Sequence, residues 1–121
     1  MILSPNFNPE VVSTAIHLGL VCLPGVLTAT EAFAALSAGA TGLKIFPAEM
    51  ASPAAVKALR AVLPAGTLML PVGGITPGNM AAYLASGANG FGIGSALSVG
   101  GKTAQDVELT AITFAAAQRS F

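Results

Sequence analysis

One lysine of this sequence, Lys44, stands inside an otherwise apolar run, Gly42-Leu-Lys-Ile-Phe-Pro47. A neutral amine can attack a carbonyl carbon to form an imine, and burial disfavours the charged ammonium form. Successive residues of a strand point to opposite faces, so Lys44 and Phe46 share one face of this run. If Leu43 and Ile45 pack against helices on the other face and the strands form a barrel, Lys44 points into the barrel interior, toward the end where barrel enzymes place their active sites. The pattern predicts that Lys44 is a nucleophile. The alternative is that its aliphatic part is buried while its ammonium group reaches water at the end of the strand, without a role in chemistry.

Two glycine-rich segments follow apolar runs later in the chain, Pro71-Val-Gly-Gly74 and Gly92-Ile-Gly-Ser95. Glycine lets backbone N–H groups approach an anion closely, and the helix that Thr76-Pro77 should open adds a favourable dipole. In (β/α)8 barrels a phosphate site commonly lies in the loops after strands 7 and 8. The alternative is that both segments are only tight corners. The residues of the predicted anion site are Gly73, Gly74, Gly94 and Ser95.

Other cofactor and metal signatures are missing from the sequence. The series Gly90-x-Gly92-x-Gly94 does not have the spacing of a dinucleotide-binding fingerprint, and no acidic residue ends a following strand. Cys22 is the one cysteine, and neither Cys-x-x-Cys nor a His/Cys cluster occurs. We therefore expect no cofactor and no metal.

The elements that must position these residues follow a repeated pattern of a short apolar run, a polar or Gly/Pro turn and an amphipathic stretch. Capping side chains precede proline at Asn8-Pro9, Ser52-Pro53 and Thr76-Pro77, and Thr28 to Glu31 forms a capping-box pattern. Strands joined through helices run parallel, so the fold class is α/β over one domain, 1–121. The pattern alone fits an open sheet or a closed barrel. The apolar runs are 2–4, 20–23, 43–46, 68–72 and 91–94, and the last helix spans 103–119.

Composition excludes several classes of protein. The chain is 54% hydrophobic and 8% charged, with five basic and five acidic residues, so it has a core but no basic face for nucleic acid. Residues 61–101 carry no charge, yet proline and glycine break them before a run of about 18 apolar residues forms. We therefore expect no membrane partner. The start of the chain has no signal-peptide pattern, which favours the cytoplasm.

The motifs together resemble the Schiff-base aldolases that cleave 2-keto-3-deoxy-6-phosphogluconate and its galactonate epimer. This resemblance implies that Lys44 forms an imine with the substrate ketone, and that the glycines and Ser95 hold the 6-phosphate. It also implies that Pro24, Phe46 and Val72 line the pocket. The matching segments are Ser4-Pro-Asn6, Pro24-Gly25, Thr28 to Glu31, Leu43 to Glu49, Pro71 to Pro77 and Gly92 to Ser95.

The resemblance implies a phosphorylated keto-deoxy sugar acid as substrate, with pyruvate and glyceraldehyde 3-phosphate as products. Valine before Gly-Gly is typical of the galactonate type and threonine of the gluconate type, so Val72 favours the galactonate epimer. The gluconate enzyme is the first alternative. Other phosphate-binding barrels, such as thiamine-phosphate synthases, and a non-catalytic phosphate-binding fragment are further alternatives.

The family's fold is a complete (β/α)8 barrel. Compared with it, this chain corresponds to five of the eight strand–helix units, those of strands 4 to 8. We therefore expect a carboxyl-terminal portion that lacks the family's strand-2 glutamate, which shuttles protons, and the segments that bind the substrate carboxylate. Open strand edges would favour association, either as the family's homotrimer or through the barrel edge. Aldolase activity of the isolated chain should fall by at least about 10²-fold.

Overall fold

The structure of the chain is a computed structural model that describes residues 1–119. Helices α1 to α4 each follow a strand in the chain, and all strand pairs are parallel, which confirms the expected α/β architecture. The strands are β1 (Ile2–Leu3), β2 (Cys22–Leu23), β3 (Gly25–Val26), β4 (Leu43–Ile45) and β5 (Met69–Pro71). The helices are α1 (Pro9–His17), α2 (Ala29–Ser37), α3 (Pro53–Val62), α4 (Met80–Ala85) and α5 (Ala104–Arg119).

The strands pair in their order along the chain. β1 pairs with β2, and β3, β4 and β5 form a second ladder in which β4 is central. The ladder registers place Lys44 between Gly25 on β3 and Leu70 on β5. Consecutive parallel strands bring their carboxyl ends to one edge of the sheet, so the loops after β4 and β5 meet there.

The strand around Pro24 extends further than the sequence indicated. The expected strand ended at Leu23, whereas parallel pairing resumes at Gly25 and continues to Val26. Proline cannot donate a hydrogen bond to a ladder, but its carbonyl can accept one. The carbonyl of Pro24 accepts from the backbone N–H of Lys44 at 3.0 Å. The proline therefore divides the strand without ending it.

The helix starts were predicted correctly at three capping residues. Asn8 and Ser52 each accept hydrogen bonds from the first turn of the following helix, with proline at its start. Thr28 and Glu31 form the complete capping box of α2. Helices α2 and α3 pack against β3, β4 and β5 through one core that includes Leu43 and Ile45, both fully buried, whereas the buried residues of α1 form a second cluster with Cys22 of β2.

Two elements near the end of the chain differ from the prediction. The run 91–94 is reduced to an isolated bridge between Val72 and Gly92. Helix α4 begins at Met80 instead of Pro77. The backbone N–H of Thr76 donates to the side-chain oxygen of Asn79, and the backbone N–H of Asn79 donates to the carbonyl of Thr76, so these two bonds hold residues 76–79 in a turn. The helix is therefore present but starts three residues later than the sequence pattern predicts, with a turn at residues 77–79.

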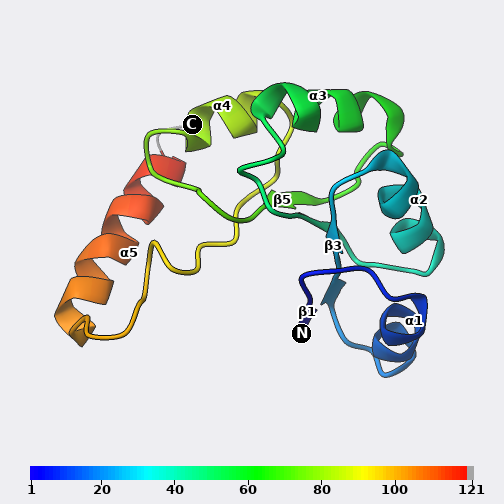
Figure 1. The fold of residues 1–121 in the computed structure, drawn as a ribbon, viewed down its shortest axis with the longest axis horizontal. Helices are drawn as coiled ribbons and strands as arrows, with labels where there is room; N and C mark the ends of the chain where they lie inside the picture. Colours follow the sequence, from blue (N-terminus) through cyan, green and yellow to red (C-terminus); the bar gives the residue numbers. More distant parts are fainter. Residues whose placement is uncertain (120–121) are drawn as a thin grey trace.

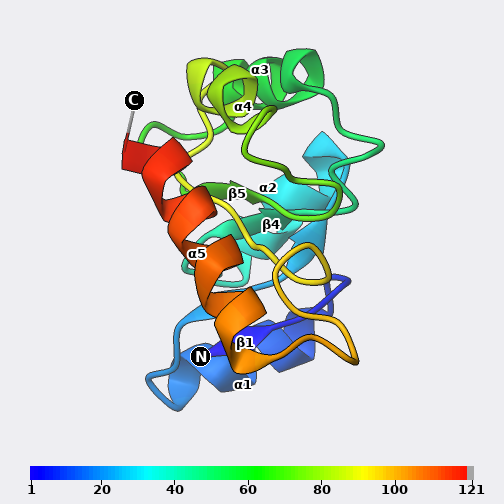
Figure 2. The same cartoon turned by 90° about the vertical axis from the view of Figure 1, so that its left-hand side faces the viewer.

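The arrangement of the helices around the strands is uneven. Figure 1 shows α1 to α4 following one another around one side of the strands, while α5 stands apart on another flank. The quarter-turn view in Figure 2 shows α5 running obliquely past the strands, with its carboxyl end near α4. Phe114 is the buried residue of α5, whereas Leu109 and Ile112 are exposed. No helix within residues 1–119 is long and apolar enough to cross a membrane.

We predict that Glu31→Ala lowers the free energy of unfolding by about 1 kcal/mol near neutral pH, the usual effect of losing a helix cap. The carboxylate accepts hydrogen bonds from Leu27 and Thr28, which lower its pKa from the ordinary 4.5. A lowered pKa means that this stabilisation is complete above pH 4.5 and disappears as the pH falls through the folded-state value.

Urea titrations between neutral pH and pH about 3 measure this difference. Glu108→Ala, at an exposed position in α5, is the matched control and should show little loss of stability. A difference between wild type and Glu31→Ala that stays constant down to acid pH would contradict the capping assignment.

Candidate active site

Lys44 lies on the face of β4 opposite the helices, as the alternation of the strand predicted. Its side chain is 8% exposed, while its neighbours Leu43 and Ile45 are fully buried in the core on the other face. The Nζ atom lies 4.1 Å from the centre of the Phe46 ring, a cation–π contact. Within residues 1–119, Nζ makes no hydrogen bond or ion pair, so the amine is held by packing and by the aromatic face alone.

The cavity that contains Lys44 is almost entirely apolar. It has a volume of about 190 Å³ and includes Val72 and Gly92 in its wall. Among the residues that the structure describes, no carboxylate lines this cavity. An apolar wall around a single amine suits attack on a carbonyl, but it supplies no partner for proton transfer. The lining residues are Met1, Leu3, Leu23, Lys44, Leu70, Val72, Phe91 and Gly92.

A second cavity, of about 170 Å³, lies directly beside the first at the carboxyl ends of β4 and β5. Val72 and Gly92 line both cavities, and Phe46 connects them because its ring contacts Nζ of Lys44 and also lines the second cavity. The structure thus gathers the four residues of the predicted anion site into one wall. The lining residues are Phe46, Val72, Gly73, Gly74, Ile75, Gly92, Ile93, Gly94, Ser95 and Ala96.

Backbone hydrogen bonds join the loop after the lysine strand to the loop that carries the glycines. Val72 donates its N–H to the carbonyl of Ile45 at 3.0 Å, and its own carbonyl accepts from Ala48 at 2.8 Å. The buried Tyr83 hydroxyl then donates to the carbonyl of Ala48 at 3.0 Å. Burial, and secondarily the Glu49 carboxylate, raise the pKa of Tyr83, so the phenol stays a donor.

The turn of the second cavity favours glycine because of its backbone conformation. Gly73 and Gly74 have φ angles of +102° and +62°, which other residues rarely adopt. A Cβ atom on Gly74 would lie 2.7 Å from Cγ of Glu49, and one on Gly73 would collide with the Glu49 carboxylate. Glu49, for which the sequence left a role near the site open, therefore packs across the back of this turn.

Asn79 is a residue of the site region that sequence reasoning missed. Its side-chain oxygen accepts from the N–H of Thr76 at 3.0 Å, and its Nδ2 donates to the carbonyl of Gly74 at 2.9 Å. The side chain thereby holds the segment from Gly74 to Thr76 in place. The Gly78-Asn79 pair was a usable turn signal, but the adjacent Thr76-Pro77 pattern indicated a helix start instead.

Pro24 differs from its expected role as a pocket-lining residue. Its side chain is fully buried, and it lines neither of the two cavities. Its carbonyl instead accepts from the backbone N–H of Lys44 and fixes the strand that carries the lysine.

Cys22 is also fully buried, and burial raises the pKa of its thiol, so it is a core residue without nucleophilic character.

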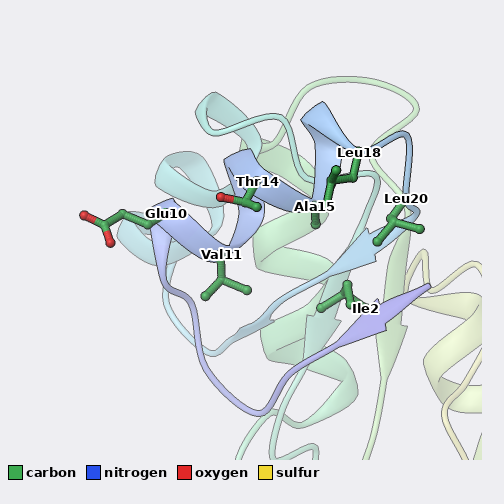
Figure 3. Close-up of a pocket in the computed structure, with 7 residues that line it drawn as sticks. All are labelled: Ile2, Glu10, Val11, Thr14, Ala15, Leu18 and Leu20. Atoms are coloured by element: carbon green, nitrogen blue, oxygen red, sulfur yellow. The ribbon is translucent and has the colours of Figure 1, made fainter.

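A third hollow, of about 400 Å³, lies between α1 and the first two strands and contains none of the predicted site residues. Figure 3 shows apolar side chains of α1 facing Ile2 and Leu20, with the Glu10 carboxylate pointing outward. It offers no convergent polar groups for a small ligand. Across residues 1–119, no three His, Cys, Asp or Glu side chains are placed to hold a metal ion.

The chain is similar to known proteins over nearly its whole length. Residues 1–114 match the family described as "Aldolase: KDPG and KHG aldolase". A "Probable 2-dehydro-3-deoxy-6-phosphogalactonate aldolase" of Rhizobium meliloti (strain 1021) is 46% identical over 117 residues, 97% of this chain and 55% of that protein. The 2-dehydro-3-deoxy-6-phosphogalactonate aldolase of Escherichia coli (strain K12) is 43% identical over 98% of this chain and 58% of its own length.

A solved structure described as "Native KDPGal structure" superposes with a TM-score of 0.96 at 43% identity. The match covers 98% of this chain and 58% of that one. This chain therefore spans less than two thirds of the length of these relatives.

We predict that Gly73→Ala and Gly39→Ala lower the free energy of unfolding by similar amounts, about 1 kcal/mol, because both place alanine in a backbone conformation that favours glycine. Both glycines have similar positive φ angles, +102° and +93°, so the backbone penalty is matched. A Cβ on Gly39 meets Ile16 at an ordinary 3.6 Å, and one on Gly73 meets the Glu49 carboxylate, the flexible end of an exposed side chain that can turn away at little cost. Thermal or urea unfolding measures the difference.

The double variant Gly73→Ala with Glu49→Ala tests whether the Glu49 side chain gives way. Removing the carboxylate should change the loss of stability little, since the backbone penalty dominates. A Gly73→Ala variant that costs clearly more than Gly39→Ala, and that recovers in the double variant, would contradict this prediction.

Proposed function

The chain belongs to the KDPG and KHG aldolase family, and we propose that it supplies the imine-forming lysine and the phosphate cavity of a carbon–carbon lyase. The proposed substrate is 2-dehydro-3-deoxy-6-phosphogalactonate, cleaved to pyruvate and glyceraldehyde 3-phosphate. The observation that carries this proposal is the position of Lys44, buried in an apolar cavity against Phe46 and adjacent to the glycine-lined cavity.

In the proposed reaction the neutral amine of Lys44 attacks the C2 ketone, and loss of water gives an iminium ion. A base takes the proton of the C4 hydroxyl, the C3–C4 bond breaks, and its electron pair moves toward the iminium nitrogen as the C4 aldehyde forms. Protonation of the resulting enamine at C3 and hydrolysis release pyruvate and restore the amine. The iminium nitrogen would keep its position over the Phe46 ring, whose face stabilises a cation.

The proton transfers in this reaction require an acid–base group. The described lining of the Lys44 cavity contains no carboxylate. We therefore assign to these residues the covalent step and the binding of phosphate. Proton transfer is left to a group outside this lining.

The glycine-lined cavity is proposed to bind the 6-phosphate. Backbone N–H groups at Gly73, Gly74 and Gly94 and the Ser95 hydroxyl would donate to the phosphate oxygens. No cationic side chain among the described residues lines this cavity. Binding would depend on geometry held by the Ala48–Val72 and Asn79–Gly74 hydrogen bonds. Anchoring the phosphate away from the reacting bond would orient the ketone toward Lys44.

We propose that the five strand–helix units correspond to strands 4 to 8 of a (β/α)8 barrel. The support is the TM-score of 0.96 against a family structure of which this chain covers 58%, and the sequential parallel pairing of the strands. In that arrangement Lys44 would point to the barrel interior. The two glycine segments would follow strands 7 and 8, where barrels commonly bind phosphate.

The preference for the galactonate epimer rests on Val72 and on the names of both relatives described above. Val72 lines both cavities, so its side chain lies between the proposed imine and the proposed phosphate site. A methyl group there offers no hydrogen bond to a substrate hydroxyl, whereas threonine would. The gluconate epimer is the alternative substrate.

We predict that pyruvate with borohydride labels Lys44 selectively, because reduction of its imine leaves a stable secondary amine. Lys57 and Lys102 are exposed and serve as internal controls in the same chain. Peptide mass spectrometry after digestion locates the adduct, and Lys44→Met should abolish it. Equal labelling of the three lysines, or labelling that persists in Lys44→Met, would contradict the proposed nucleophile.

In a restored full-length protein, we predict that Val72→Thr shifts the ratio of kcat/KM for the two epimers toward the gluconate form by about ten-fold, or about 1.4 kcal/mol. Coupled assays of pyruvate release from each epimer measure this ratio. Val72→Ile, which adds volume without a hydroxyl, is the control for shape. An unchanged ratio in Val72→Thr would show that Val72 only packs and does not select the epimer.

A further inference from the structure

The segment after the last strand bridge is weakly attached to the rest of the fold. In Figure 1 it runs from the strands to the start of α5, coloured yellow to orange. The last backbone bond to the sheet is from Gly92 to the carbonyl of Pro71 at 3.1 Å. Within the described chain, the hydrogen bonds of residues 94–103 stay inside the segment or reach the first turns of α5. Ser95, which lines the anion cavity, therefore depends on local bonds for its position.

The local bonds around Ser95 form one compact turn. The carbonyl of Gly94 accepts from Leu97 at 2.9 Å and from Ser98 at 3.1 Å. Such a turn leaves the carbonyls at its far end without backbone partners. These are the carbonyls of Ala96 and Leu97, and the Nζ atom of Lys102 lies 3.3 and 3.2 Å from them.

Lys102 is well placed to close this turn. A cation at the carboxyl end of a turn satisfies its free carbonyls and opposes their partial negative charge. The backbone N–H of Lys102 also donates to the carbonyl of Val99 at 3.3 Å. This bond spans Gly100 and Gly101 and brings Lys102 back toward the turn. The pKa of the Asp106 carboxyl is lowered mainly by its hydrogen bonds from the side chain and backbone of Thr103. The positive charge of Lys102 makes a smaller contribution in the same direction.

We propose that Lys102 is a positioning residue for the anion cavity. Its ammonium group closes the turn at residues 94–98, and this turn presents Ser95 and Ala96 to a bound phosphate. The inference rests on the proposed phosphate site, but the role of Lys102 comes from its own contacts. Lys102 does not line the cavity, so it acts through Ser95 rather than by touching the anion.

Titration calorimetry of the chain with inorganic phosphate tests this role. Lys102→Met should weaken phosphate binding about three- to ten-fold, because two charge-assisted hydrogen bonds are lost at an exposed site. Lys102→Arg should remain within about two-fold of wild type, since guanidinium can donate to both carbonyls. Lys57→Met removes an exposed lysine from α3 and should leave binding unchanged.

Two further measurements separate positioning from long-range attraction. The effect of Lys102→Met should persist near 1 M salt, where the screening length is about 3 Å. Amide hydrogen exchange at Leu97 and Ser98 should become faster in Lys102→Met than in Lys57→Met. Pyruvate trapping at Lys44, which does not involve the phosphate, should be unaffected.

The outcomes distinguish the inference from the proposed function beneath it. If Ser95→Ala binds phosphate as tightly as wild type, the anion cavity itself is wrongly assigned. If Ser95→Ala weakens binding but Lys102→Met does not, only the role of Lys102 is overturned. Loss of the Lys102→Met effect at high salt, or unchanged exchange at Leu97 and Ser98, would also overturn it.

Discussion

The parallel pairing of β4 with β5, carried past the strand ends by the hydrogen bond from Ala48 to Val72, is the constraint on which the site depends. It holds the loop after the lysine next to the loop that carries the glycines. Because of it, Phe46 can contact Nζ of Lys44 on one side and line the glycine cavity on the other. A reactive amine and an anion cavity thereby share a wall without any direct bond between their side chains.

The features predicted most reliably from the sequence depend on short-range rules. Alternation along β4 placed Leu43 and Ile45 in the core and Lys44 on the opposite face, and the structure confirms this. Capping chemistry located the starts of α1, α2 and α3. The glycine motifs also come together as expected, because parallel order brings consecutive loops to one edge.

The features missed by the sequence depend on contacts between distant residues. Nothing local distinguishes Pro24 as a ladder acceptor rather than a pocket wall, since its role is decided by its register with Lys44. Glu49 reaches across the Gly73–Gly74 turn from another loop, and Asn79 overrides the helix start at Pro77 by bonding back to Gly74 and Thr76. The fifth apolar run forms only a bridge because few partners hold the segment after Gly92.

The central claim is that Lys44 and the glycine cavity form one site. A crystal structure of the pyruvate adduct trapped by borohydride, grown in phosphate, tests it most directly. The account predicts reduced pyruvate on Nζ of Lys44 over the Phe46 ring, with phosphate within hydrogen-bond distance of Ser95 Oγ and the backbone N–H of Gly74. Phosphate bound elsewhere, or an adduct directed away from the cavity that Val72 and Gly92 share, would contradict it.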